Sequence, residues 1–150
     1  MKKFTPRLCA LMATLTLVLT LLVPMACAAE TASYYFIGTD AVAYAEADGK
    51  IYIEAECIGT GVMDEIGVES ITIYERQSDG YYDDVYTYTR YNTSGMIRYN
   101  NYEHFKSVTY QGTVGKKYYA EIAFYAEDSE GNETLYHSSN VVTAVRTPTN

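Results

Sequence analysis

The stretch from 117 to 127 constrains the fold most, because every second side chain in it is apolar or aromatic while charged side chains occur only between them. The even positions, from Tyr118 through Phe124 to Ala126, are all apolar or aromatic, whereas the odd positions include Glu121 and Glu127. Alternation with a period of two is typical of a β-strand that is buried on one side only. The stretch therefore predicts a central strand of a β-domain.

Glycines mark the entry to this strand. Gly112 and Gly115 lie in the six residues before Tyr118 and predict a tight turn. A tyrosine at the start of a strand that follows such a turn is where sandwich domains place a tyrosine corner. We expect Tyr118, Gly112 and Gly115 to serve structure rather than chemistry.

The rest of the chain has the same character. Short alternating segments are separated by Gly- and Asn-marked turns, and no segment of ten or more residues after position 28 has a helical period. The pattern favours an all-β fold, an antiparallel immunoglobulin- or fibronectin-III-like sandwich of seven or eight strands. Residues 59–67 are expected to form a crossover loop and 96–102 a short irregular segment. The strands are expected at 40–47, 50–58, 68–76, 81–91, 105–111, 117–127 and 133–145, with 34–37 as an optional first edge strand.

The N-terminus has the pattern of a secretory signal peptide. Lys2, Lys3 and Arg7 precede an apolar run from 8 to 23, and Ala26-Cys27-Ala28 fits a cleavage site. We expect cleavage after Ala28 and release into the medium, with no membrane association afterwards. The alternatives are a retained apolar anchor and lipid attachment at Cys27. The domains would then be a signal peptide at 1–28, one β-domain at 29–145 and a flexible tail at 146–150.

Charge and cysteine content limit the partners and the redox chemistry. After residue 28 the chain keeps eight basic and nineteen acidic residues, a formal net charge of −11. A chain this acidic is repelled by nucleic acid and by anionic membranes, and we expect a monomer. Cys57 would be the single remaining cysteine, so we expect no internal disulfide and a buried, structural thiol in the strand at 50–58.

Tyrosine is the outlier of the composition, with 17 residues against no tryptophan. Tyrosine is a good strand former and fills cross-strand pairs, which is one interpretation. An exposed aromatic face that binds a glycan or a protein is the other, because Tyr offers an apolar face and a hydroxyl at low entropic cost. The densest group is the candidate ligand site: Tyr81, Tyr82, Tyr86, Tyr88 and Tyr91.

No spacing in the chain predicts a catalytic or metal centre, and we expect no cofactor. His104 and His137 are isolated, with no Cys, Ser or Asp at a recognisable distance. Acidic residues cluster at 79–84 and at 128–133, where Ca²⁺ is an alternative, but neither cluster has the spacing of a calcium loop. A pair of carboxylates that hydrolyses glycosidic bonds stays open, because the distance between such carboxylates depends on the fold.

Five motifs stand out along the chain: Gly59-Thr-Gly-x-Met63-Asp64-x-Ile66-Gly67, Ile71-x-Ile73-Tyr74-Glu75, Thr93-Ser94-Gly95-Met96, Tyr99-Asn100-x-Tyr102-x-His104, and Val108, Tyr110, Gln111, Gly112, Gly115, Tyr118, Tyr119 and Ala126. Together they resemble a family of small secreted proteins of Gram-positive, clostridia-like bacteria. The resemblance covers roughly residues 35–140 and implies a bacterial, secreted protein. That family has no assigned activity, so the resemblance implies no catalytic residue. Some members carry Trp near positions 82–84, where this chain has Tyr82 and Asp84.

These observations favour a secreted, non-catalytic binding or adhesion module whose ligand is a glycan or a protein. One alternative is an extracellular hydrolase that uses paired carboxylates. Another is a structural or inhibitor-like protein that acts through loop contacts at 92–102.

Overall fold

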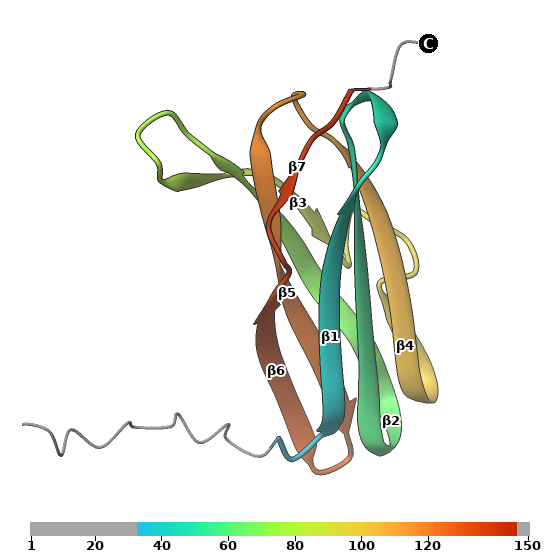
Figure 1. Cartoon of the computed structure of the whole chain (residues 1–150). Helices are drawn as coiled ribbons and strands as arrows, with labels where there is room; N and C mark the ends of the chain where they lie inside the picture. Colours follow the sequence, from blue (N-terminus) through green and yellow to red (C-terminus); the bar gives the residue numbers. More distant parts are fainter. Residues whose placement is uncertain (1–32, 147–150) are drawn as a thin grey trace, which may run out of the picture. The chain divides into compact units, whose positions relative to one another are not determined.

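The computed structural model describes residues 33–146, which lie in the second of two units, Met1–Ala32 and Ser33–Asn150. The predicted signal peptide with Cys27, and residues 147–150 of the predicted tail, lie outside the described residues. Among the described residues, no helix is long and apolar enough to cross a bilayer. The elements are β1 (Phe36–Ala45), the 3₁₀ turn η1 (Ala47–Gly49), β2 (Lys50–Arg76), β3 (Tyr82–Thr89), β4 (Ile97–Gln111), β5 (Lys117–Asp128), β6 (Gly131–Ser138) and β7 (Val142–Thr143) (Figure 1).

Strand β2 organises the sheet. It pairs antiparallel with β1, β3, β4 and β5, while β5 also pairs with β6 and β7. Its first arm, up to Ile58, lies between β1 and β4. Its second arm pairs with β5 on one side, and with β4 and then β3 on the other. The prediction of an all-β antiparallel fold is therefore confirmed, with seven strands in the described part.

The prediction of a crossover loop at 59–67 is wrong. Residues 50–76 form one continuous strand element, and its ladder to β4 is interrupted only between Ile58 and Met63. Figure 1 shows β2 turning back on itself in this region. The glycines suggested a loop, but Met63 and Ile66 continue the buried pattern and the partner strand β4 bends with β2. The segment at 96–102, predicted to be irregular, joins the strand at 105–111 in the same way.

The bend places side chains from both arms of β2 in one core. Ile51, Ile53 and Cys57 from the first arm and Ile71 and Ile73 from the second are all buried in the same cluster. Tyr118, Ala120, Ile122, Phe124 and Ala126 from β5 complete it, which confirms the buried face predicted from their alternation. The strands nevertheless form one strongly curled, hydrogen-bonded sheet, so an immunoglobulin-like pair of separate sheets stays a prediction.

Side chains, not a backbone ladder, link β1 and the residues just before it to β6 and the segment just after it. The Asn140 amide accepts a hydrogen bond from Ala43 N–H (2.8 Å) and donates one to Ala43 O (3.0 Å). Near the other end of β1, the Glu133 carboxylate accepts bonds from Ser33 Oγ (2.8 Å) and Tyr35 N–H (3.1 Å). These contacts occupy backbone groups that an exposed edge strand would otherwise offer to another chain.

Candidate functional site

Three tyrosine rings gather on the outer face of the sheet, the face opposite to the core. Tyr74 of β2 and Tyr119 of β5 are direct partners in the ladder, and their rings stack with centroids 4.8 Å apart and planes 7° apart. Tyr82 of β3 meets Tyr119 edge to face at 5.0 Å and 76°. We call Tyr74, Tyr82 and Tyr119 the tyrosine trio. Each ring is only half-buried, so the trio presents aromatic surface to solvent.

Burial and a nearby carboxylate act on the hydroxyls of two members of the trio, Tyr74 and Tyr119. Burial, and then the nearby Glu121 carboxylate, raise the pKa of both Tyr74 and Tyr119. Asp84 adds to the effect at Tyr74. The Tyr74 and Tyr119 phenols thus stay protonated to a higher pH than usual, and in this form each can donate and accept hydrogen bonds. An aromatic surface with a few fixed polar groups is the usual composition of a ligand site.

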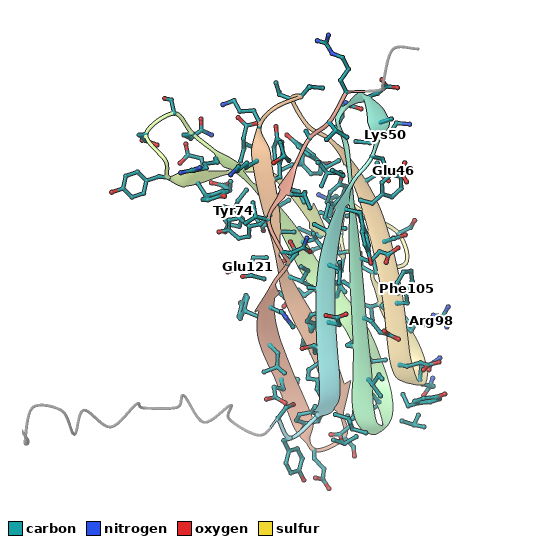
Figure 2. The ribbon with its side chains drawn as sticks, viewed as in Figure 1. Glu46, Lys50, Tyr74, Arg98, Phe105 and Glu121 are labelled. Atoms are coloured by element: carbon teal, nitrogen blue, oxygen red, sulfur yellow. The ribbon has the colours of Figure 1, made fainter. Side chains whose placement is uncertain are left out.

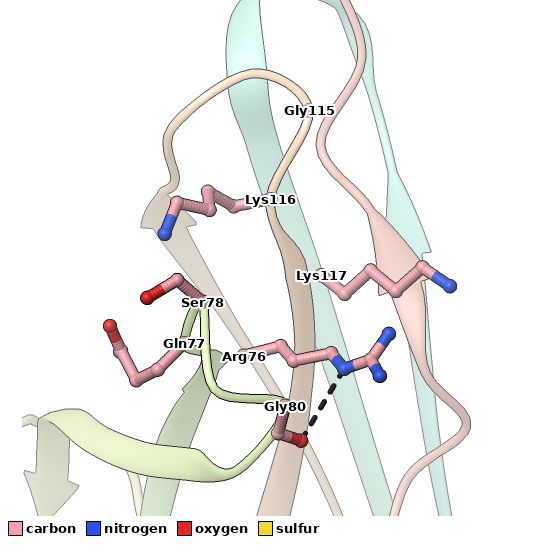
Figure 3. Close-up of a pocket in the computed structure, with 7 residues that line it drawn as sticks. All are labelled: Arg76, Gln77, Ser78, Gly80, Gly115, Lys116 and Lys117. Atoms are coloured by element: carbon pink, nitrogen blue, oxygen red, sulfur yellow. Dashed lines mark hydrogen bonds between the residues drawn. The ribbon is translucent and has the colours of Figure 1, made fainter.

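Basic side chains lie at the other end. Arg76 lies two residues after Tyr74 on β2, and Lys117 lies two residues before Tyr119 on β5. Because side chains alternate along a strand, Arg76 and Lys117 lie on the same face as the two tyrosines. Both are exposed and line a cavity of about 300 Å³ between the β2–β3 and β4–β5 turns. Figure 3 shows the Arg76 and Lys117 head groups pointing to the same side, whereas Lys116 points the other way. The Lys116 ammonium lies 3.2 Å from Glu75 Oε1.

The structure divides the predicted group of five tyrosines into three sets. Tyr82 belongs to the trio. Tyr86 and Tyr88 are cross-strand partners of Ile73 and Ile71, and therefore lie on the core side of β3. Tyr81 and Tyr91 flank β3 and are 75% and 88% exposed.

Tyr86 and Tyr88 take part in packing between β3 and β4. Their rings are 4.7 Å apart, and Tyr86 lies 6.3 Å from Tyr110, which in turn lies 5.8 Å from Tyr118. The Tyr88 hydroxyl donates to Thr109 O at 2.6 Å. These contacts give Tyr88 a structural role, although Tyr86 keeps 47% of its surface exposed.

Sequence reasoning missed Tyr74 and did not single out Tyr119 as a site residue. Each directly follows a buried residue in its strand, Tyr74 after Ile73 and Tyr119 after Tyr118, so each points to the outer face. This outward position is visible in the sequence. The ladder register that pairs Tyr74 with Tyr119, and the β-bulge that re-aims Tyr82, are not.

The predicted structural residues lie around Tyr118. Its hydroxyl accepts a hydrogen bond from Thr113 N–H at 2.8 Å, the backward contact that a tyrosine corner makes. A Cβ at Gly112 would lie 2.8 Å from the Tyr118 ring, and Gly115 turns the chain with φ +88°. Cys57 is buried and free. Burial raises the pKa of its thiol to about 12, which makes it a poor nucleophile.

A second, smaller cavity lies on another side of the unit. It has a volume of about 150 Å³ and is lined by Glu56, Arg98, Glu103, His104 and Phe105. In Figure 2, Arg98 and Phe105 lie on the opposite side of the ribbon from Tyr74 and Glu121. His104 is 4% exposed, and its Nε2 lies 3.1 Å from Gly95 O, which makes Nε2 the protonated nitrogen. Burial lowers its pKa, and its Nδ1 has no partner.

Within residues 33–146, no group of three or more His, Cys, Asp or Glu side chains is placed to hold a metal ion. The acidic residues Asp128 and Glu130, considered for Ca²⁺, form a turn in which the Asp128 carboxylate accepts from Glu130 N–H at 2.8 Å. This contact is that of an ordinary Asx turn.

Comparison with family models finds no match, and none of the curated proteins matches the chain. The predicted resemblance to a clostridial secreted family therefore stays a prediction. Among solved structures, the X-ray structure of Northeast Structural Genomics Consortium target SoR45 is similar, with a TM-score of 0.37 and 11% identity over 74% of this chain and 83% of that chain. A likeness at that level carries no argument about function.

Proposed function

We propose that this protein is a secreted, non-catalytic binding module that holds an extracellular glycan on the tyrosine trio. The observation that carries the proposal is the trio itself, three half-buried rings on the outer face of the sheet, with Tyr74 and Tyr82 each in contact with Tyr119. The C–H face of a sugar ring packs well against an aromatic ring, and the phenol hydroxyls can bond to sugar hydroxyls. Secretion rests on the signal-peptide pattern at 1–28.

The direct test is a glycan array followed by titration of any ligand found. Tyr74→Ala and Tyr119→Ala should each weaken binding at least about tenfold, which corresponds to about 1.4 kcal/mol. The matched control is Tyr44→Ala, because Tyr44 is a 49% exposed tyrosine of β1 that pairs with Tyr52 on the first arm of β2. Thermal unfolding of each variant would show that the fold is retained. Binding that survives both trio substitutions would overturn the proposal.

The same array also decides between the trio and the more exposed tyrosines of the predicted group. Tyr91 has the greatest exposure, 88%, and lies in the turn after β3. Tyr91→Ala should leave affinity unchanged if the trio binds the ligand. Loss of binding on Tyr91→Ala alone would move the site to that turn.

A second candidate function is hydrolysis by paired carboxylates. Glu56 and Glu103 line the same small cavity, together with His104 and Arg98. Two carboxyl groups on either side of a glycosidic bond are the usual machinery for such hydrolysis. Release of reducing ends from a polysaccharide that is abolished by both Glu56→Gln and Glu103→Gln would support this candidate. Turnover that both variants retain would exclude these residues.

We also propose that the curled sheet is a variant of the immunoglobulin- or fibronectin-type sandwich. The folded β2 supports this, since its two arms contribute Ile51, Ile53, Ile71 and Ile73 to one core. The backward hydrogen bond to Tyr118 is a second supporting feature. An experimental structure in which the arms of β2 did not face each other across the core would overturn it.

The predicted cellular location can be tested separately. The form that begins at Ala29 should be recovered from the culture medium of the native host. Recovery of the protein exclusively from membranes would favour the alternative of a retained anchor or of a lipid at Cys27.

A further inference from the structure

We propose that the ligand of the tyrosine trio is an acidic glycan, one whose sugar rings carry carboxylates, and that Arg76 and Lys117 bind such a carboxylate. This inference rests on the proposed function and adds the class of ligand. It concerns one continuous surface, the trio together with the basic side chains next to it on β2 and β5.

The cavity at the basic end of this surface carries charge of the opposite sign to the net charge of the chain. Residues 29–150 contain eight basic and nineteen acidic side chains, yet three of the eight basic ones, Arg76, Lys116 and Lys117, line a single cavity. A local concentration of positive charge in an acidic protein attracts anions to that place and repels them elsewhere. A carboxylate next to the trio is therefore favoured over a neutral group.

The two outward-pointing cations differ from the third. Lys116 is paired with Glu75, at 3.2 Å, and points away from the outer face. Arg76 uses its Nε–H on Gly80 O at 3.4 Å, which orients the guanidinium while its other N–H groups remain for a ligand. Lys117 is exposed, and no ion pair with it is present among the described residues. An oriented guanidinium next to an ammonium matches the geometry of a carboxylate.

Distances along the strands connect the rings with the cations. Residues two apart on one face of a strand are about 7 Å apart, so the head groups of Arg76 and Lys117 are within reach of a sugar that stacks on the trio. Glu121 and Asp84 near the other end of the trio disfavour a second close negative charge there. The surface thus fits carboxylates spaced by neutral sugar, and it disfavours a uniformly charged chain such as a nucleic acid.

The test compares ligands that differ only in charge. Oligogalacturonate and its fully methyl-esterified form share one backbone, and oligomers of glucuronate- and mannuronate-containing glycans extend the panel. The intact chain should bind at least one acidic oligomer about tenfold more tightly than its esterified form at 50 mM salt. The preference should shrink as salt rises, because screening weakens exposed ion pairs.

Variants separate the binding of a glycan on the trio from the preference for an acidic glycan. Arg76→Gln/Lys117→Gln should abolish the preference, so that the acidic and the esterified oligomer bind with equal affinity. Lys117→Gln alone should reduce the preference, and it changes an exposed residue whose loss leaves the fold intact. Lys50→Gln removes the same charge on another side of the unit, as Figure 2 shows, and should have no effect.

Three results would overturn the inference. Equal affinity for the acidic and esterified forms, with loss of both on Tyr119→Ala, would leave the proposed function standing and remove the acidic ligand. A preference that survives Arg76→Gln/Lys117→Gln would place the carboxylate elsewhere. Equally tight, Arg76-dependent binding of duplex DNA would show a general anion site. Failure of the proposed function would appear differently, as binding that Tyr74→Ala and Tyr119→Ala do not change.

Discussion

The hydroxyl of Tyr118 donates a hydrogen bond of 2.5 Å to Glu75 Oε2, and the two residues are direct partners in the ladder between β2 and β5. The same hydroxyl accepts from Thr113 N–H at 2.8 Å. The tyrosine is fully buried, so it joins the second arm of β2, the start of β5 and the turn before it in a single contact. This contact supports the strands that carry Tyr74 and Tyr119.

Removal of the Tyr118 hydroxyl should destabilise the fold. Tyr118→Phe leaves the Thr113 N–H without its partner and takes a donor from Glu75, so the free energy of unfolding should fall by about 1–3 kcal/mol. Tyr110→Phe is the matched control, because the Tyr110 ring packs next to Tyr118 and its hydroxyl makes no hydrogen bond to any of residues 33–146. It should stay within about 0.5 kcal/mol of the parent in urea unfolding. Equal effects of the two changes would contradict this role for the hydroxyl.

Glu75 should make stability depend on acid pH. Its hydrogen bond from Tyr118, and then that from Lys116, lower its pKa below the ordinary 4.5. A carboxyl with a lower pKa in the folded state stabilises the fold at pH values above 4.5, and this stabilisation is lost as the pH falls through the folded-state pKa. Glu75→Gln should therefore be less stable than the parent at pH 7, and the difference should shrink towards pH 3.

The check is a set of urea unfolding curves from pH 3 to pH 7. Glu46→Gln is the control, because Glu46 is an exposed carboxylate near the start of β2. The difference in the free energy of unfolding between Glu46→Gln and the parent should be the same at every pH. A constant difference between the parent and Glu75→Gln over the whole range would mean that the ionised carboxylate is not the stabilising form.

The core was predictable from the sequence to the extent that alternation reports it. Tyr118 to Ala126 and Ile51 to Cys57 lie buried where their period of two places them. The fold of β2 was not predictable, since Gly59 and Gly61 read as loop residues. A strand can continue through such glycines when its partner bends at the same point, and this depends on a ladder between residues far apart in sequence.

The candidate site was predictable only in kind. An abundance of tyrosine without tryptophan indicated an aromatic face, and Tyr82 was in the predicted group. The density of tyrosines at 81–91 was misleading, because neighbouring positions on a strand point to opposite faces and a bulge lies between Asp84 and Tyr86. Rings that meet, such as Tyr74 and Tyr119, are brought together by register across strands.

Gly67 should tolerate no side chain. A Cβ there would lie 2.3 Å from Met96 O and 2.9 Å from the His104 ring, at a φ of +154°. Gly67→Ala should cost about 1–3 kcal/mol from backbone strain, and the contact with Met96 O should add to this. Gly61→Ala in the same strand meets nothing within 4 Å and should cost less than about 1 kcal/mol. Similar melting temperatures for the two variants would argue against the close packing of β2 on His104.

Cys57 should be chemically silent in the folded protein. The thiol is fully buried, its Sγ lies 3.7 Å from Gly67 O, and its pKa is raised to about 12, so almost no reactive thiolate exists at pH 8. In a chain that begins at Ala29, where Cys57 is the single cysteine, a thiol reagent should label the protein only as it unfolds in urea. The labelling midpoint should match the unfolding midpoint seen by tyrosine fluorescence. Rapid labelling without urea would mean that β2 and β4 open locally around Cys57 and His104, and the core would then be less closed than its burial indicates.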